Sequence, residues 1–392
     1  MLRLIQNSFF TSNKSSSFQG AFIASGIMAF AGLGDALLYS VLPVYGASMG
    51  FSVFLIGVLL SVNRFVRIIA NTHIANIVRS IGMKKVLLIS SSFAVLTTLV
   101  YGLKLGIVSF FLARILWGLS YSGLKISTLN YAAIVKKHAG LAFGISQSIK
   151  SLGAFFILIV GPILIGAYGI EIGFFMIASI SSVGVFLAFL LPEQDAKQGA
   201  GKVKTATTFA PTPINLLVFI LAFTIDGILV VVLSDLFLNK QLGMNELLVY
   251  ISFYLLLKRL FVLIFSFISG FLSLKISTLK MFNAAILFCI AAIFLIAFNY
   301  TVLGIVVAFL FNTIIVTFAP LIAIEIENQN TLQSISGTST WWDLGAAIGA
   351  FSGIFLIKET GSFYLFFTLG IVVIILFFNF FIQYGNTNQR TI

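Results

Sequence analysis

Long apolar runs, separated by short polar turns, occupy almost the whole chain. A run of about 20 apolar residues forms a helix long enough to cross the hydrocarbon core of a bilayer. The pattern predicts twelve such spans, at 20–46, 52–76, 84–103, 107–133, 140–168, 173–191, 213–238, 246–273, 280–298, 301–324, 338–357 and 362–384. Only 9% of the 392 residues are charged, whereas soluble domains carry about a quarter. The chain is therefore predicted to be an all-α integral membrane protein.

One long polar stretch interrupts this pattern. Residues 192–212 read PEQDAKQGAGKVKTATTFAPT and lie between the sixth and seventh predicted spans. The predicted organisation is an amino-terminal six-helix half at 1–191, a cytoplasmic linker at 192–212 and a carboxy-terminal six-helix half at 213–392.

The two predicted halves resemble each other weakly. Three pairs of residues fall at a similar shift along the chain: Asp35 with Asp226, Arg64 with Arg259, and Gly169 with Gly361. Paired repeats of this kind are typical of secondary transporters, whose substrate site lies near the midplane where the repeats meet. The repeat therefore predicts a site between the halves.

The basic residues are distributed unevenly over the predicted loops. With the amino terminus inside, three basic residues fall on the outer side, namely Lys104, Lys240 and Lys358. Thirteen fall on the inner side, namely Arg3, Lys14, Arg79, Lys84, Lys85, Lys136, Lys137, Lys197, Lys202, Lys204, Lys275, Lys280 and Arg390. Because cytoplasmic loops are enriched in Lys and Arg, we expect both termini in the cytoplasm. The net charge of +12 is then a topology signal in a cell membrane, with a bacterial inner membrane expected, and no nucleic-acid partner is expected.

Seven basic residues remain inside the predicted spans, where a charge costs at least about 2.5–3.5 kcal/mol and normally faces the bundle interior. They are Arg64, Arg67, Arg114, Lys125, Lys150, Lys258 and Arg259. Arg64 and Arg67 are three residues apart and share a helical face, which Asn71 extends. Two interpretations stay open: a cationic patch that binds an anionic substrate, or counter-charges that neutralise Asp35 and Asp226.

Two acids lie well inside predicted spans, Asp35 in the first and Asp226 in the seventh. An ionised carboxylate in a membrane needs a basic or hydrated partner, whereas a protonated one does not. We expect Asp35 and its repeat mate Asp226 to couple transport to protons or to bind substrate. The alternative for Asp35 is a structural ion pair with an arginine of span 2 or span 4.

Two in-span lysines have polar surroundings in the sequence. Lys125 in SGLKIST and Lys150 in SQSIKSLG are flanked by Ser, Thr, Gln and Gly. This composition favours a water-lined wall that binds substrate, with Gln147 beside Lys150, and snorkelling to the headgroups is the alternative. Lys258 and Arg259 are adjacent and point about 100° apart on a helix, so only one can face the cavity squarely. The repeat favours Arg259.

A cluster of Trp341, Trp342 and Asp343 stands near the start of the predicted eleventh span. Tryptophan at a span end is typical of anchoring at the membrane interface. We therefore expect Asp343 near the cytoplasmic surface, where it would gate transport by pairing with Lys150. Glu327, after the tenth span, is expected on a solvated face.

Catalytic and metal-binding patterns are weak in this chain. Two histidines and one cysteine, Cys289, lie far apart and give no metal-ligand spacing. No nucleotide-binding loop of the G-x-x-x-x-G-K-[ST] type appears. The predicted loops are too short for a dense catalytic cluster, so neither an enzyme nor a cofactor is expected.

Three short motifs point to a known family. The loop between spans 2 and 3 reads ANIVRSIGMKK and matches the pattern G-x-L-a-D-R-x-G-R-K at Gly82 and Lys84, with Arg79 where the pattern has an acid. In span 4, RILWGLS matches R-x-x-q-G-x-g at Arg114 and Gly118, and span 5 carries GPILIG, similar to a glycine-proline motif of exporters. With its twelve spans and central linker, the chain resembles the major facilitator superfamily over nearly its whole length.

The resemblance implies two six-helix halves that expose a central site alternately to the two sides of the membrane. It also implies gating through Gly82 and Lys84 and proton transfer involving Arg114. The excess of in-span bases over acids independently favours an anionic or carboxylate-bearing solute. The sequence thus favours a monomeric, proton-coupled secondary transporter of a small anion. The alternatives are a proton-antiport exporter of amphipathic or cationic compounds and a lipid flippase.

Overall fold

The computed structural model describes residues 12–46, 49–103, 105–193, 211–237, 244–327 and 330–384, and every element assigned within them is a helix. This confirms the predicted all-α fold class. Most of the predicted linker, at 194–210, lies outside the described residues, as do seven of the basic residues used for orientation: Arg3, Lys104, Lys197, Lys202, Lys204, Lys240 and Arg390. The cytoplasmic placement of the termini therefore stays a prediction.

The first group of helices, called here the amino-terminal group, consists of α2 (Ser12–Ala31), α3 (Leu33–Tyr45), α4 (Val53–Ile81), α5 (Met83–Gly102), α6 (Ile107–Ala133), the short 3-10 turn η1 (Lys136–His138) and α7 (Ala139–Phe189). Helices α2 and α3 follow each other with a bend of 40° at Gly32 and together form the first span. The bend places Asp35 in the first turn of α3, where the positive end of the helix dipole favours a carboxylate.

The second group, called the carboxy-terminal group, consists of α8 (Pro213–Leu221), the π-helix η2 (Ala222–Ile228), α9 (Leu229–Val231), α10 (Leu233–Phe237), α11 (Met244–Leu272), α12 (Thr278–Ala297), α13 (Thr301–Ile326) and α14 (Thr331–Tyr384). Helix α8 starts with Pro213 at a position where its missing N–H costs nothing. The Thr212 hydroxyl caps the helix by accepting from the backbone N–H of Asn215 at 3.4 Å.

Helices α7 and α14 each contain two spans, because each reverses direction at a glycine. Gly169 in α7 has φ 81° and Gly361 in α14 has φ 75°, a backbone conformation that glycine adopts without steric cost. The described residues contain nine helices long and apolar enough to cross a membrane, or ten when the bent α2–α3 pair counts as one span. With the two reversals, the described helices are consistent with the twelve predicted spans.

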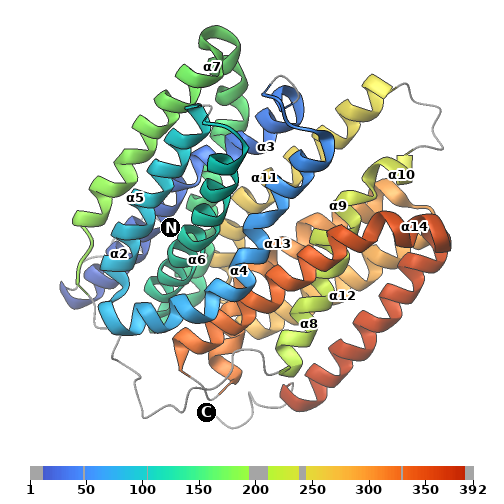
Figure 1. Ribbon diagram of the computed structural model, residues 1–392. Helices are drawn as coiled ribbons and strands as arrows, with labels where there is room; N and C mark the ends of the chain where they lie inside the picture. Colours follow the sequence, from blue (N-terminus) through green and yellow to red (C-terminus); the bar gives the residue numbers. More distant parts are fainter. Residues whose placement is uncertain are drawn as a thin grey trace.

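Figure 1 shows the amino-terminal group, coloured blue to green, beside the carboxy-terminal group, coloured yellow-green to red. Within the first group, α7 packs on α2 and α5, and α4 packs on α6. Within the second, α12 packs on α13, and α14 packs on α8 and η2. Two pairs of helices carry the main contacts between the groups, α7 with α11 and α4 with α14.

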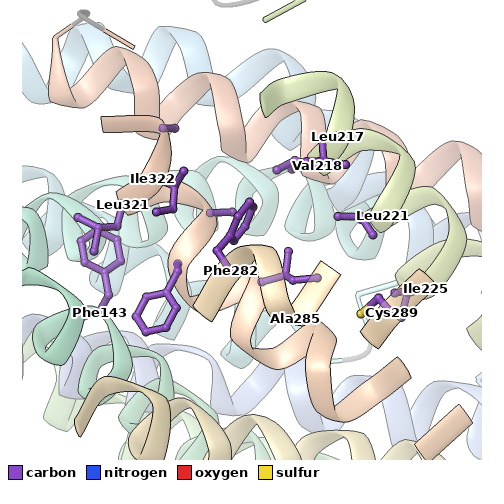
Figure 2. Packing of buried hydrophobic residues seen from close by; sticks show 14 of the residues in the cluster. Phe143, Leu217, Val218, Leu221, Ile225, Phe282, Ala285, Cys289, Leu321 and Ile322 are labelled. Carbon is purple, nitrogen blue, oxygen red and sulfur yellow. The ribbon is translucent and has the colours of Figure 1, made fainter. Parts of the chain in front are cut away.

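The largest apolar cluster contains side chains from both groups, as Figure 2 shows in part. Burial of this apolar surface alone does not drive helix association in lipid, so close packing must hold the cluster together. The labelled members come from α7, α8, η2, α12 and α13: Phe143, Leu217, Val218, Leu221, Ile225, Phe282, Ala285, Cys289, Leu321 and Ile322. Cys289 is fully buried, as its apolar sequence context predicts.

The contact between α7 and α11 depends on two glycines near the end of the bundle predicted to face the cytoplasm. A Cβ atom added to Gly144 would lie 2.5 Å from the Gly270 Cα atom and 2.5 Å from the Ser266 carbonyl oxygen. Nearby, the Ser148 hydroxyl donates to the Leu263 carbonyl oxygen at 2.6 Å. Small residues that let two backbones touch are typical of tight helix packing in membranes. The two groups are therefore in direct backbone contact at this end.

The Gly144→Ala variant tests this contact. The added methyl group must push α7 away from α11, and overpacking of this kind costs about 1–3 kcal/mol. We expect a lower midpoint of thermal unfolding in purified protein than in the matched variant Gly166→Ala, because a Cβ at Gly166 meets nothing within 4 Å. Equal midpoints for the two variants would show that the α7–α11 contact is loose.

Candidate functional site

Asp35 on α3 and Arg114 on α6 form a buried ion pair inside the amino-terminal group. The Arg114 side chain has no exposed surface, and its Nε donates to the Leu59 carbonyl oxygen at 2.7 Å. Its guanidinium also lies 5.7 Å from the ring of Tyr39, whose hydroxyl donates to the Leu60 carbonyl oxygen at 3.1 Å. The sequence left two interpretations of Asp35 open, and one of them was an ion pair with an arginine of span 2 or span 4. The structure contains this ion pair, with Arg114 of span 4. The pair joins two residues predicted separately for proton coupling.

Asp226 forms a second ion pair, inside the carboxy-terminal group. It lies in the π-helix η2, a local widening of the helix that often occurs at functional sites. Its Oδ1 accepts from Lys258 Nζ at 2.5 Å and from Asn312 Nδ2 at 3.2 Å. Helix α11 thus brings Lys258 rather than Arg259 to Asp226, whereas Arg259 interacts with Lys150 and Tyr121. The expectation that Arg259 faces the cavity stays a prediction.

Asp343 makes a third cluster, and this one joins the two groups. Its Oδ1 lies 3.2 Å from Arg67 Nη2, and its Oδ2 lies 3.6 Å from Lys125 Nζ and 3.3 Å from Asn71 Nδ2. The guanidinium of Arg67 also lies over the ring of Tyr121, 4.6 Å from its centroid. The predicted face of Arg67 and Asn71 is thus confirmed, and its partner is an acid of the opposite group.

Two expectations about Asp343 are wrong. Helix α14 begins at Thr331, twelve residues before Asp343, which is about 18 Å along the helix. Asp343 is 5% exposed and lies inside the bundle rather than near the cytoplasmic surface. Its ion-pair partners are Arg67 and Lys125 rather than Lys150. Asp35 and Asp226 form their direct ion pairs with Arg114 and Lys258, so the direct partner of Arg67 is Asp343, and Asp35 acts on Arg67 only from a longer distance.

Positive charge exceeds negative charge around Asp343. Arg64, Arg67 and Lys125 all interact electrostatically with Asp343. Lys150 on α7 interacts with Lys125, Arg67 and Arg259, as well as with Asp343. In the part of the chain that the structure describes, Lys150 has no carboxylate at ion-pairing distance. Five bases, Arg64, Arg67, Lys125, Lys150 and Arg259, therefore interact around Asp343. Asp35 and Asp226, each paired with another base, also act on Arg67 and Lys125 from a longer distance.

The remaining predicted residues lie beside this cluster or at the bundle end. Gln147 is half-buried on α7, three residues before Lys150. Gly82, with φ 90°, ends α4, and Lys84 lies in the first turn of α5. A shallow cavity of about 430 Å³ at the α12–α13 turn is lined by uncharged residues from Asn299 to Val306 and is no part of this cluster.

Several residues that shape these clusters were missed from the sequence. Tyr39 is four residues from Asp35, and Tyr121 is four residues from Lys125, so helical spacing could have identified both. The sequence around Asn312 contains no pattern that indicates its contact with Asp226. Glu327, expected on a solvated face, is 7% exposed and accepts from the Thr212 hydroxyl at 2.6 Å. Burial raises the pKa of the Glu327 carboxyl group, while the Thr212 hydrogen bond opposes that shift.

The pair of Asp35 and Arg114 gives a stability prediction. Asp35→Asn leaves a fully buried guanidinium without its counter-charge, so the free energy of unfolding should fall by about 3–5 kcal/mol. The double variant Asp35→Asn, Arg114→Gln should recover much of this loss, whereas the exposed carboxylate variant Glu359→Gln should change little. Chemical unfolding in detergent micelles measures these three variants and the single variant Arg114→Gln, which completes the cycle. Purely additive single-variant effects would show that the pair is not energetically coupled.

Comparisons with known proteins place this geometry in a family. No curated protein matches the sequence. Among solved structures, the human organic anion transporter MFSD10 (TETRAN) is similar at 14% identity with a TM-score of 0.69, over 93% of this chain and 98% of that chain. The fucose transporter FucP in its outward conformation is similar at 14% identity with a TM-score of 0.76, over 93% and 98%. The proton:xylose symporter XylE is similar at 13% identity with a TM-score of 0.71, over 93% and 95%.

These structures are below 25% identity and show the fold. The family profile of the Major Facilitator Superfamily matches residues 24–338, most of the chain and both groups of helices. Together with the twelve-span pattern, this match establishes that the chain belongs to the Major Facilitator Superfamily of multi-pass membrane transporters.

Proposed function

We propose that this protein is a proton-coupled secondary transporter that moves a small anionic or carboxylate-bearing solute by alternating access. The observation that carries the proposal is the cluster of five bases around Asp343, in which Lys150 has no carboxylate partner among the described residues. An uncompensated cation inside a membrane protein is costly, so a site of this kind favours an anionic ligand. The bases come from α4, α6 and α7 of one group and α11 of the other.

The proposed substrate site lies between two halves, residues 1–191 and 213–392. We assign the substrate's negative group to the bases of this cluster. Lys150 and Arg259 bind it together with Arg67 and Lys125, the two bases that Asp343 contacts in this structure. Arg64, Asn71 and Gln147 lie around it. Lys150 on α7 and Arg259 on α11 belong to the helices whose glycines touch at the predicted cytoplasmic end. We infer that breaking this contact opens the site toward the predicted cytoplasmic side.

Proton coupling is assigned to the two ion pairs inside the groups. Protonation of Asp35 or Asp226 would remove its attraction to Arg114 or Lys258 and loosen the helices that the pair joins. The solved relatives support each part of the proposal, since one is named as an organic anion transporter and others as proton symporters. An exporter of cationic compounds is less well supported, because both of these acids are already neutralised by bases.

A flux experiment tests the proposed function. Purified protein in proteoliposomes should take up at least one of succinate, lactate, benzoate or inorganic phosphate, and an inward proton gradient should accelerate uptake. Asp226→Asn should reduce the acceleration, because it removes one of the two carboxylates to which proton coupling is assigned. If none of these anions is transported, the assignment of an anionic substrate is wrong. If the rate of transport does not depend on the proton gradient, the assignment of proton coupling is wrong.

The substrate residues give a separate prediction. Lys150→Met and Arg259→Met should each raise the KM for the transported anion about tenfold or more, because each removes a charge-assisted contact of about 1.5–3 kcal/mol. Lys275→Met is the matched control, since Lys275 is exposed at the end of the bundle, and its KM should stay at the wild-type value. Unchanged KM values in the first two variants would remove these residues from the site.

A further inference from the structure

Asp343 connects the two groups of helices through ionic contacts and a hydrogen bond where α14 packs on α4. It belongs to α14 in the carboxy-terminal group, whereas its partners Arg67, Asn71 and Lys125 belong to α4 and α6 in the amino-terminal group. Both of its oxygens are engaged, and its side chain is 6% exposed. No such bridge exists at the other two described ion pairs, which each stay within one group.

The contacts of Asp343 are long for charge-assisted ones. They measure 3.2 Å to Arg67, 3.3 Å to Asn71 and 3.6 Å to Lys125, whereas such bonds are usually about 2.7–2.9 Å. By contrast, Asp226 lies 2.5 Å from Lys258. Within the described chain, the buried Arg67 Nε has no hydrogen-bond acceptor. A guanidinium can hold a carboxylate through two parallel bonds, so Arg67 is only partly satisfied.

We propose that Asp343 is a built-in competitor of the substrate: in the empty transporter it occupies the cations that bind the substrate's anionic group, and the substrate displaces it. This inference rests on the proposed anionic substrate and goes beyond it by assigning Asp343 a specificity-determining role. A free carboxylate or phosphate can approach Arg67 in the two-bond geometry that Asp343, tethered to α14, does not reach.

Displacement of Asp343 links binding to movement. A ligand shifts a conformational equilibrium only by its different affinities for the two states. An anion that binds Arg67 and Lys125 does so only where Asp343 has left, and that departure removes the ionic bridge between α4 and α14. Binding free energy is thereby converted into separation of the two groups.

The competition makes a prediction that a purely structural role does not make. In the wild-type protein the cations are free of Asp343 in only a small fraction of molecules, and this raises the apparent dissociation constant of the anion. Removing the competitor should therefore tighten binding. The full-length protein is titrated with succinate, benzoate and inorganic phosphate while its thermal unfolding is followed. For the probe that stabilises the wild type most, Asp343→Asn should lower the apparent dissociation constant about tenfold or more.

The matched control is Glu359→Gln, which removes an exposed carboxylate from the same helix and should leave the constant unchanged. Weaker or equal binding by Asp343→Asn, with binding by the wild type intact, overturns the competitor role and leaves the proposed function standing. Absence of binding by both proteins for all three probes overturns the competitor role and the anionic substrate class together.

A second measurement does not depend on how well Asp343→Asn folds. Spin labels at Lys85 and Lys275, both exposed, report the separation of α5 from the α11–α12 turn at the predicted cytoplasmic end in a protein that keeps Asp343. The probe that binds should shift the distance distribution to longer values. A distribution that stays unchanged at saturating probe contradicts displacement of Asp343 by the anion.

Discussion

The cost of a charge in a low-dielectric interior governs the arrangement of this protein. Three acids deep in the helical spans, Asp35, Asp226 and Asp343, each contact at least one base. Asp35 pairs with Arg114, and Asp226 pairs with Lys258. Each of these ion pairs joins helices within one group. Five bases interact around Asp343, and the two paired acids act on Arg67 and Lys125 only from a longer distance. That excess is the electrostatic basis for an anionic substrate.

The same electrostatics distinguish rigid from movable contacts. Ion pairs inside each group stabilise that group as a unit, whereas Asp343 reaches across the boundary on long contacts to Arg67 and Lys125. The other main boundary contact is between the backbones of Gly144 and Gly270. Both contacts are made by polar or small residues, and the apolar cluster beside them also contains side chains from both groups.

Much of the fold follows from the sequence, because the length of an apolar run indicates whether it can form a helix that crosses a membrane. The runs predicted twelve spans, and the described helices agree with them, including reversals at Gly169 and Gly361 that the repeat had paired. Helical spacing correctly placed Arg67 and Asn71 on one face. The span 4 motif indicated Arg114, and a pair between Asp35 and an arginine of span 2 or span 4 was one of the two interpretations of Asp35.

Long-range partners could not be predicted in the same way. Asp343 was expected at the surface because the start of its helix was placed at residue 338, seven residues beyond the observed start at Thr331. The polar run before Trp341 hid that start, since hydropathy measures lipid exposure and this segment is buried among other helices. Whether Lys258 or Arg259 contacts Asp226 depends on how α11 is rotated relative to η2. The spacing of residues within one helix contains no information on that rotation.

The most direct test of the account is an experimental structure of the protein with a transported anion bound. The account predicts that the anion lies within hydrogen-bonding distance of Lys150 and Arg259, contacts Arg67, and has displaced Asp343 from Arg67. An anion bound elsewhere, with the bridge between Asp343 and Arg67 intact, would contradict it.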